Sequence, residues 1–174
     1  MKLEILSKDN QKHSRLAWEL YQRSFPKSER RDADEQEKIM KKSDYRFEMI
    51  LEDENFLGIM FLWETNDFIF LEHFATLEDL RGKGIGSKAL ELLKARGKTV
   101  ILEIEPPVDE LTRRRCGFYQ RNSMILNPHY HVQAKYRVGD DDLELKIMSY
   151  PKVLSNEEYE SFYTYMKREV EAKG

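Results

Sequence analysis

A loop rich in glycine and basic residues carries the clearest chemical signal in the sequence. Its residues, in order, are Arg81, Gly82, Lys83, Gly84, Ile85, Gly86 and Ser87. The loop follows a strand-like stretch, and a helical pattern begins within it. Glycines remove side chains that would keep a ligand away from the backbone, and the unpaired amides at a helix start favour an anion. The loop therefore predicts a site for a phosphate-bearing ligand, to which Arg81 and Lys83 add positive charge.

A loop of this composition has three other interpretations. A tight glycine-rich turn that only packs a helix on a strand stays open as an alternative. A Walker A loop requires Lys and then Ser or Thr after its last glycine, whereas Gly86 is followed by Ser87 and Lys88. A dinucleotide fingerprint requires glycine where Ser87 stands, and it requires a parallel strand-helix-strand unit. The strands before the loop predict an antiparallel meander instead, which argues against a nucleotide-binding or dehydrogenase-like domain.

The elements that must position this loop follow from hydrophobic periodicity. The expected order is a strand at 2–6, a helix ending at 25–26, a polar connector at 25–31, a helix at 33–42, strands at 45–52, 56–64 and 67–75, a helix from 85 to about 96, a strand at 99–105, a helix from 109 to about 122, a strand near 143–147 and a last helix after 155. Short turns between the three consecutive strands indicate the meander. No repeat or linker interrupts the 174 residues, so we expect a single domain, 1–174.

Composition excludes several classes of partner. The net charge is only −3, with both signs interspersed, so no overall field attracts nucleic acid. One cysteine excludes an internal disulfide, and four scattered histidines offer no zinc spacing, so we expect no metal. No apolar run is long enough to span a bilayer, and the first residues lack the pattern of a signal peptide. We therefore expect a soluble, cytoplasmic protein with no membrane partner.

The segment 68–93 resembles the acetyl-CoA-binding core of the GNAT N-acetyltransferases. That family has Gln or Arg, two residues, Gly, one residue, and Gly or Ala, which Arg81 to Gly86 match. The resemblance implies an α/β (α+β) fold, with a central mixed, mostly antiparallel, twisted sheet flanked by helices. It also implies acetyl-CoA as cosubstrate, with its pyrophosphate on residues 81–87. The strand ending in Phe74, Ala75 and Thr76 would then pair with the pantetheine arm, and a backbone amide there would stabilise the oxyanion.

We predict two catalytic residues, a general base and a general acid. Strand alternation places Glu72 on one face with Phe68, Phe70 and Phe74, where an apolar setting would raise its pKa and suit a general base. The alternative is a charge paired with a neighbouring Lys or Arg. His73 should then point to the opposite face, which favours a structural role.

Tyr119 is the predicted acid, because the stretch 117–121 resembles the family segment whose tyrosine protonates the CoA thiolate. A phenol with a pKa near 10 holds its proton at neutral pH. The alternative is a core aromatic residue. Two departures from the family stand nearby: Ser123 and Met124 replace Gly-Phe, and Thr112 replaces an asparagine that often contacts the pantetheine.

The acceptor side carries weaker signals, each with a structural alternative. Glu103 and Glu105 lie on one side of a strand and would attract a cationic amine, or else pair with Arg113 to Arg115 or face water. The run of arginines would reach the cofactor's phosphates or form a solvated face. The stretch 129–136 suits a loop over a pocket, or an arm for homodimer contact. The connector residues Glu29, Arg30 and Arg31 lie where the family's first two helices often cover the acceptor.

Taken together, the sequence predicts an acyl-CoA-dependent N-acetyltransferase. The acceptor would be a primary amine of a small molecule, an amino acid or a peptide. The alternative is a non-catalytic GNAT-fold module that binds acyl-CoA for regulation, and loss of Glu72 or Tyr119 would have favoured it.

Overall fold

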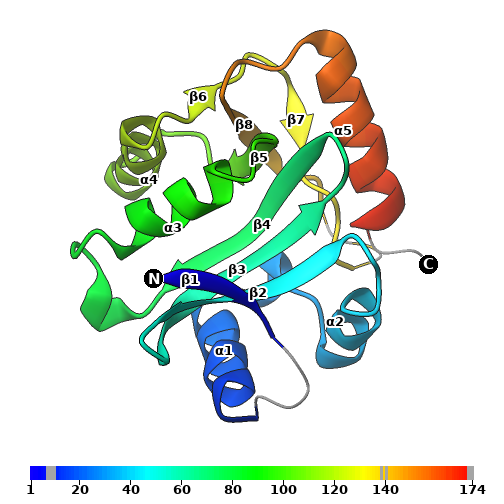
Figure 1. Cartoon of the computed structure of the whole chain (residues 1–174). Coiled ribbons are helices and arrows are strands. Elements are labelled where there is room, and N and C mark those ends of the chain that lie inside the picture. The colour runs from blue at the N-terminus through cyan, green and yellow to red at the C-terminus, as the bar shows by residue number, and fades with distance from the viewer. Residues whose placement is uncertain (7–10, 138, 140, 172–174) are drawn as a thin grey trace. The chain divides into compact units, whose positions relative to one another are not determined.

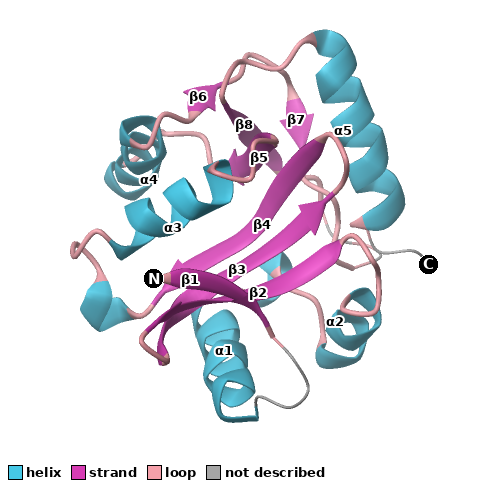
Figure 2. Cartoon of the chain, in the orientation of Figure 1, coloured by secondary structure: helices cyan, strands magenta, loops and turns pink. Residues whose placement is uncertain are grey.

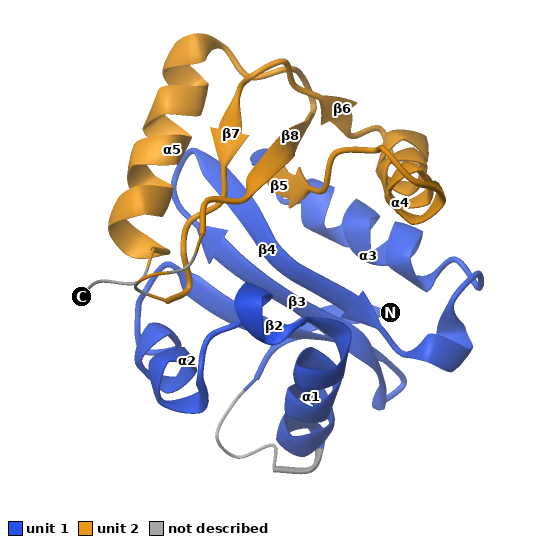
Figure 3. Cartoon of the chain, turned by 180° about the vertical axis from the view of Figure 1, so that it is seen from behind, with its two compact units in different colours: residues 1–100 blue, residues 101–174 orange. Residues whose placement is uncertain are grey.

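The computed structural model of the protein describes residues 1–6, 11–137, 139 and 141–171. It contains two compact units, residues 1–100 and residues 101–174, which are coloured separately in Figure 3. Each unit is described by itself below, and the expectation of a single domain stays a prediction. None of the helices in the described part of the chain combines the length and the apolar character that crossing a membrane requires.

Unit 1 holds the elements that precede residue 100 (Figure 1). They are β1 (Lys2–Ile5), α1 (Gln11–Ser24), the short helix η1 (Lys27–Glu29), α2 (Ala33–Ile39), β2 (Tyr45–Glu52), β3 (Asn55–Glu64), β4 (Phe68–Thr76), the short helix η2 (Glu78–Leu80) and α3 (Ile85–Lys94). The expected helix over 33–42 ends early. The amide of Lys42 bonds to the carbonyl of Ile39, three residues back, which turns the chain toward β2.

The strands of unit 1 form an antiparallel sheet in the order β1-β2-β3-β4 (Figure 2), which confirms the predicted meander. The sheet carries a helix on each face. On one face, the ring of Tyr21 in α1 lies 4.7 Å from the ring of Phe61 in β3. On the other face, Arg96, just after α3, binds Glu48 of β2. This double cover explains why both faces of β2, β3 and β4 are largely buried, with Trp63 and Phe61 fully enclosed.

Unit 2 holds the remaining elements, with β5 crossing the boundary between the units. They are β5 (Thr99–Ile104), α4 (Glu110–Arg121), β6 (Ile125–Leu126), β7 (His131–Val132), β8 (Glu144–Tyr150) and α5 (Asn156–Glu169). Strand β8 pairs antiparallel with both β6 and β7. Asp109 caps α4 and Ser155 caps α5, each in a reciprocal capping box.

Candidate active site

The glycine-rich loop joins β4 to α3 and leaves the start of that helix without a side-chain cap. Gly84 stands at the N-cap position, and no side chain bonds to the first turn there, whereas α4 and α5 have capping boxes. Gly82 and Gly84 adopt φ of 79° and 80°, the left-handed region that favours glycine. A β-carbon added at either glycine would meet no atom within 4 Å. The amides of the first helical turn, including those of Gly86 and Ser87, are therefore available to an anion.

The charges of the loop are exposed. Arg81 forms an ion pair with Glu78 at 3.3 Å, and both side chains are more than half exposed, so this pair holds Arg81 only weakly. In the described parts of the chain, Lys83 has no ion-pair partner. Lys83, and Arg81 once it leaves its weak pair with Glu78, are able to turn toward a phosphate beside the helix start.

The last residues of β4, Phe74 to Thr76, are partly buried and pair regularly with β3. Thr76 lies opposite Gly58, and a β-carbon on Gly58 would stand 2.4 Å from the carbonyl oxygen of Ala75. Only glycine allows β3 to approach β4 this closely. Gly58 is therefore a residue that the sequence analysis missed, although a lone glycine inside a strand was the signal that could have found it.

The side chain of Glu72 is fully buried, and both of its carboxylate oxygens are bound. Arg31 lies 2.7 Å from Oε1, and the indole nitrogen of Trp63 donates to Oε2 at 3.0 Å. Burial alone would raise the pKa of Glu72, but the Arg31 guanidinium, His73 and the Trp63 N–H outweigh it, so the pKa is lowered. The expected raised pKa is therefore wrong, because the setting that seemed apolar contains a buried guanidinium. The alternative of an ion pair is what the structure shows.

A bulge explains why strand alternation misplaced His73. Phe61 pairs with His73 and Leu62 pairs with Leu71, which leaves Glu72 as an extra residue in β4. His73 and Glu72 consequently lie together, with Nδ1 3.8 Å from Oε2. The expectation that His73 points to the opposite face is wrong, because a bulge breaks the period of two. The bulge lies at Glu72, within the pairing of β4 with β3.

The connector after α1 is anchored to the same cluster. His73 Nε2 donates to the carbonyl oxygen of Glu29 at 2.7 Å, and the amide of Arg31 donates to the hydroxyl of Tyr21 at 3.1 Å. The Arg31 side chain is turned inward, with only 3% of it exposed. Of the three connector candidates, Arg31 is thus committed to Glu72, and Glu29 contributes its backbone.

In unit 2, Tyr119 lies on α4 and is half-buried. Burial, partly offset by Arg115, raises the pKa of Tyr119 to about 12, so its hydroxyl keeps its proton at neutral pH. Among the described residues, none forms a hydrogen bond with this hydroxyl. The side chain is therefore a protonated donor that is not committed elsewhere.

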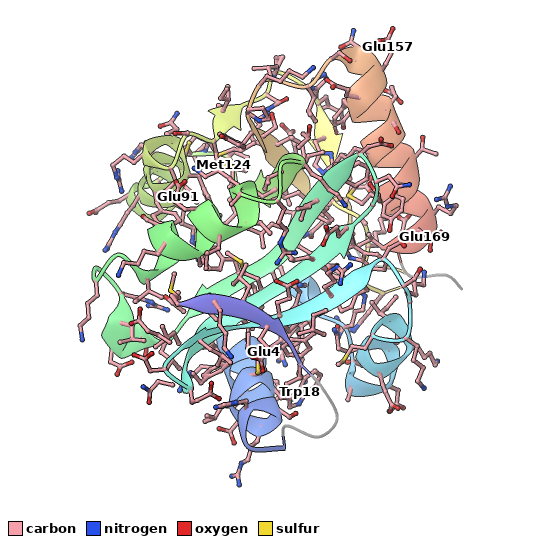
Figure 4. All side chains as sticks on the ribbon, viewed as in Figure 1. Glu4, Trp18, Glu91, Met124, Glu157 and Glu169 are labelled. Carbon is pink, nitrogen blue, oxygen red and sulfur yellow. The ribbon has the colours of Figure 1, made fainter. Side chains whose placement is uncertain are left out.

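The two departures from the family pattern have simple structural accounts. Ser123 adopts φ of 65°, the left-handed conformation that a glycine would take, and the next residue, Met124, which is labelled in Figure 4, is buried. The turn is therefore kept with serine in it. The Thr112 hydroxyl closes the capping box with Asp109, so it is committed to the start of α4.

The two glutamates of the β5 region have different partners. Glu105 forms an exposed ion pair with Arg115, which is one of the alternatives considered for it. Glu103 instead has Oε1 at 2.6 Å from Nε2 of His131, which is itself fully buried. This partner was missed, because 28 residues separate the two in sequence and no local pattern joins them.

Comparison with known proteins identifies the family. Residues 13–123, more than half of the chain, match the model of the Acetyltransferase (GNAT) family. The chain belongs to the GNAT family. The YjbC protein of Bacillus subtilis (strain 168), which carries the name of an acetyltransferase, is 29% identical over 153 residues, covering 81% of this chain and 78% of that protein.

Solved structures agree with this assignment. A GNAT-family protein of Bacteroides thetaiotaomicron matches with a TM-score of 0.93 and 27% identity over the whole of both chains. An aminoglycoside 6'-N-acetyltransferase complexed with coenzyme A matches with a TM-score of 0.60 and 14% identity, covering 86% of this chain and 98% of that one, which shows a shared fold. The predicted fold class, a mixed, mostly antiparallel sheet flanked by helices, is confirmed.

Membership of the GNAT family supports acetyl transfer from acetyl-CoA. The residues of the loop fit such a ligand, because an uncapped helix start behind two left-handed glycines suits a pyrophosphate. Within the described ranges, no three His, Cys, Asp or Glu side chains gather in a way that would hold a metal ion.

Proposed function

We propose that this GNAT protein transfers an acetyl group from acetyl-CoA to a primary amine of a small molecule, an amino acid or a peptide. The observation that carries the proposal is the uncapped start of α3, where Gly82 and Gly84 hold the left-handed backbone and leave open space beside it. Acetyl-CoA supplies the activated acetyl group as a thioester. A cytoplasmic location and a homodimer stay predictions.

Each group of residues has one task in this proposal. The backbone of residues 82–87 binds the pyrophosphate, chiefly through the amides of the first turn of α3, and Arg81 and Lys83 add charge to that site. The backbone of Phe74, Ala75 and Thr76 positions the pantetheine arm and the oxyanion. Tyr119 holds a proton on Oη that it gives to the departing sulfur.

The role of Glu72 as general base stays a prediction, and its contacts favour the ion-pair alternative. A base must have an oxygen that can take a proton from the amine, and both oxygens of Glu72 accept hydrogen bonds already. The non-catalytic alternative, a module that only binds acyl-CoA, is disfavoured by the uncommitted, protonated hydroxyl of Tyr119.

The first experiment is thermal unfolding with and without acetyl-CoA, CoA and NAD. A ligand that binds only the folded state raises the midpoint, so both CoA species should raise it and NAD should not. Release of free thiol in the presence of amines then separates the transferase from the binding module. No stabilisation by either CoA species would contradict the proposal.

Two glycines that flank α3, Gly84 before it and Gly97 after it, give this experiment a matched control. Gly84→Asn keeps a residue type that tolerates the left-handed backbone but places a side chain in the space beside the amides, so the acetyl-CoA effect should fall. Gly97 has φ of 73° and open space around its β-carbon position, and it follows the other end of α3. Gly97→Asn should therefore leave the acetyl-CoA effect unchanged.

The Tyr119→Phe variant tests the proposed acid. It should keep the stabilisation by acetyl-CoA while lowering kcat by about 100-fold, the usual size of a general acid's contribution. A normal kcat, or a loss of stability alone, would assign Tyr119 to the core.

A further inference from the structure

The last residues of β4 lie between two features of its pairing with β3 (Figure 2). Before them, the bulge at Glu72 interrupts the pairing. After them, the amide of Leu77 donates to the carbonyl oxygen of Leu57 at 2.9 Å, which extends the pairing beyond the end of β4. Residues 58–60 of β3 stand opposite residues 74–76, so β3 determines where this segment lies on that side.

Alternation along the pair decides which backbone groups of the segment face β3. In an antiparallel pair, positions that exchange hydrogen bonds with the neighbouring strand alternate with positions that do not. Leu77 bonds to β3 through its amide, so Ala75, two residues before it, also belongs to the bonded set. The amides of Phe74 and Thr76 then point to the edge of β4 that faces away from β3. A ligand that lies along that edge would meet these two amides.

Gly58 sets how closely the two strands approach at this point. It lies opposite Thr76, and a β-carbon placed on it would stand 2.4 Å from the carbonyl oxygen of Ala75 and 3.0 Å from Cα of Thr76. Real β-carbons essentially never come closer than 3.0 Å to such atoms, and both of these atoms belong to the backbone. Any side chain at position 58 would therefore push the Ala75 oxygen away, from 2.4 Å to 3.0 Å or beyond.

This displacement would reach the opposite edge of β4. The carbonyl of Ala75 and the amide of Thr76 belong to one planar trans peptide group, in which C=O and N–H point in opposite directions. When the oxygen that faces β3 moves, the N–H on the far edge moves with it. A carbon added at Gly58 thus acts, through one rigid peptide group, on the edge that a ligand would contact.

We propose that Gly58 is a positioning residue for acetyl-CoA, because its lack of a side chain fixes the peptide group between Ala75 and Thr76 against the pantetheine arm and the thioester. The inference rests on the proposed function, in which the backbone of residues 74–76 holds that arm and the oxyanion. Gly58 acts through the peptide group that it allows to lie close to β3, and not by contact with the cofactor.

The test adds one carbon at each of two glycines. Gly58→Ala presses the carbon against backbone, whereas a β-carbon at Gly117 in α4 meets Nη1 of Arg121 at 3.2 Å, the end of a flexible side chain. Calorimetric titration, at a temperature where circular dichroism shows each variant folded, measures the Kd of acetyl-CoA. Gly58→Ala should raise this Kd by about tenfold and lower kcat by about 100-fold, the size of effect that a misplacement of about 1 Å causes. Gly117→Ala should keep the Kd within about twofold of the wild type.

A second ligand separates the pantetheine arm from the glycine-rich loop. ADP has a pyrophosphate but no arm, so Gly58→Ala should leave the Kd of ADP unchanged while it raises the Kd of acetyl-CoA. A glycine with a merely structural role would lower the stability of the variant and leave both Kd values of the folded protein unchanged. Equal weakening of the two ligands, or weakening of neither, overturns the inference.

The titrations also distinguish this inference from the proposed function. If acetyl-CoA does not bind the wild type, the proposed function fails, and the positioning role of Gly58 fails with it. If acetyl-CoA binds the wild type and Gly58→Ala equally well, only the inference about Gly58 fails. If Gly58→Ala does not fold, the double variant with Ile50→Val replaces it, compared with Ile50→Val alone. The new carbon would also meet Cδ1 of Ile50, at 3.1 Å, and valine lacks that atom.

NMR of the wild type tests the placement of the peptide group without any substitution. The amide of Thr76 points away from β3 and that of Ala75 points toward it, so acetyl-CoA should shift the ¹⁵N–¹H signal of Thr76 more than that of Ala75. A larger shift at Ala75 also overturns the inference.

Discussion

Two glutamates with little exposed surface, Glu72 in unit 1 and Glu103 in unit 2, are held in opposite ways. Glu72 has no exposed side-chain surface, and Arg31 and Trp63 occupy its two oxygens. Glu103 gives one oxygen to His131 and keeps the other uncommitted, with 8% of its side chain exposed. A carboxylate whose hydrogen bonds are complete stabilises the fold, whereas one with an oxygen left over is able to take a proton.

Glu72 and Glu103 differ because their partners differ, and not because one is more buried than the other. Arg31 cannot lose its charge, so it holds Glu72 ionised and lowers its pKa. His131 is a ring that is able to gain or lose a proton, so unlike Arg31 it is not a permanent cation beside its glutamate. The comparison teaches that a buried carboxylate on the predicted catalytic strand is not automatically the base.

The largest effect that we expect is the loss of stability on removing the carboxylate of Glu72. Glu72→Ala leaves the Arg31 guanidinium buried without its counter-charge and should lower the free energy of unfolding by about 3–5 kcal/mol. Urea denaturation measures this loss. The control is Glu78→Ala, which breaks an exposed pair with Arg81 and should cost less than about 1 kcal/mol. Equal losses of unfolding free energy in the two variants would contradict the structural role of Glu72.

Acid should reveal the same ion pair without a mutation. Because Glu72 has a lowered pKa in the folded state, its contribution to stability is present above the unfolded value of 4.5 and is lost as the pH falls through the folded value. The wild type should therefore lose stability below about pH 4.5, and Glu72→Ala should lose less over the same range. Urea denaturation at several pH values measures both slopes, and parallel slopes would contradict the ion pair.

A smaller loss of stability is expected on the side of Glu103, where Tyr159 contacts His131. Tyr159→Phe removes the acceptor for His131 Nδ1 and should cost about 1–3 kcal/mol of stability. It should also shift the side-chain NMR signal of His131 Nδ1. Tyr163→Phe is the matched control, since no described residue bonds to its hydroxyl. An unchanged Nδ1 signal in Tyr159→Phe would contradict the hydrogen bond between His131 and Tyr159.

Much of the scaffold around these glutamates was predictable from local patterns. The meander, the helix start after the glycine loop and the capping boxes at Asp109 and Ser155 all depend on residues close together in sequence. Strand alternation failed at Glu72 because the bulge inserts one residue, and the hydrophobic pattern contains no sign of it.

The partners of the two glutamates were not predictable in the same way. Arg31 lies 41 residues before Glu72, and His131 lies 28 residues after Glu103. The sequence marked the connector and the stretch 129–136 as candidate regions, but only the fold selects which side chain turns inward. An ion pair for Glu72 was therefore foreseeable as an alternative, and the contact between Glu103 and His131 was not.

The smallest expected effect bears most directly on the comparison. Glu72→Gln keeps the size of the side chain and should leave the pH profile of kcat unchanged, with kcat within about twofold of wild type, once circular dichroism shows that the variant is folded at the assay temperature. If Glu72→Gln instead loses the fall in rate at low pH that a general base causes, the base is the ion-paired carboxylate. Arg31 would then have to move away during the reaction, because Oε1 has to be released before it is able to take a proton from the amine.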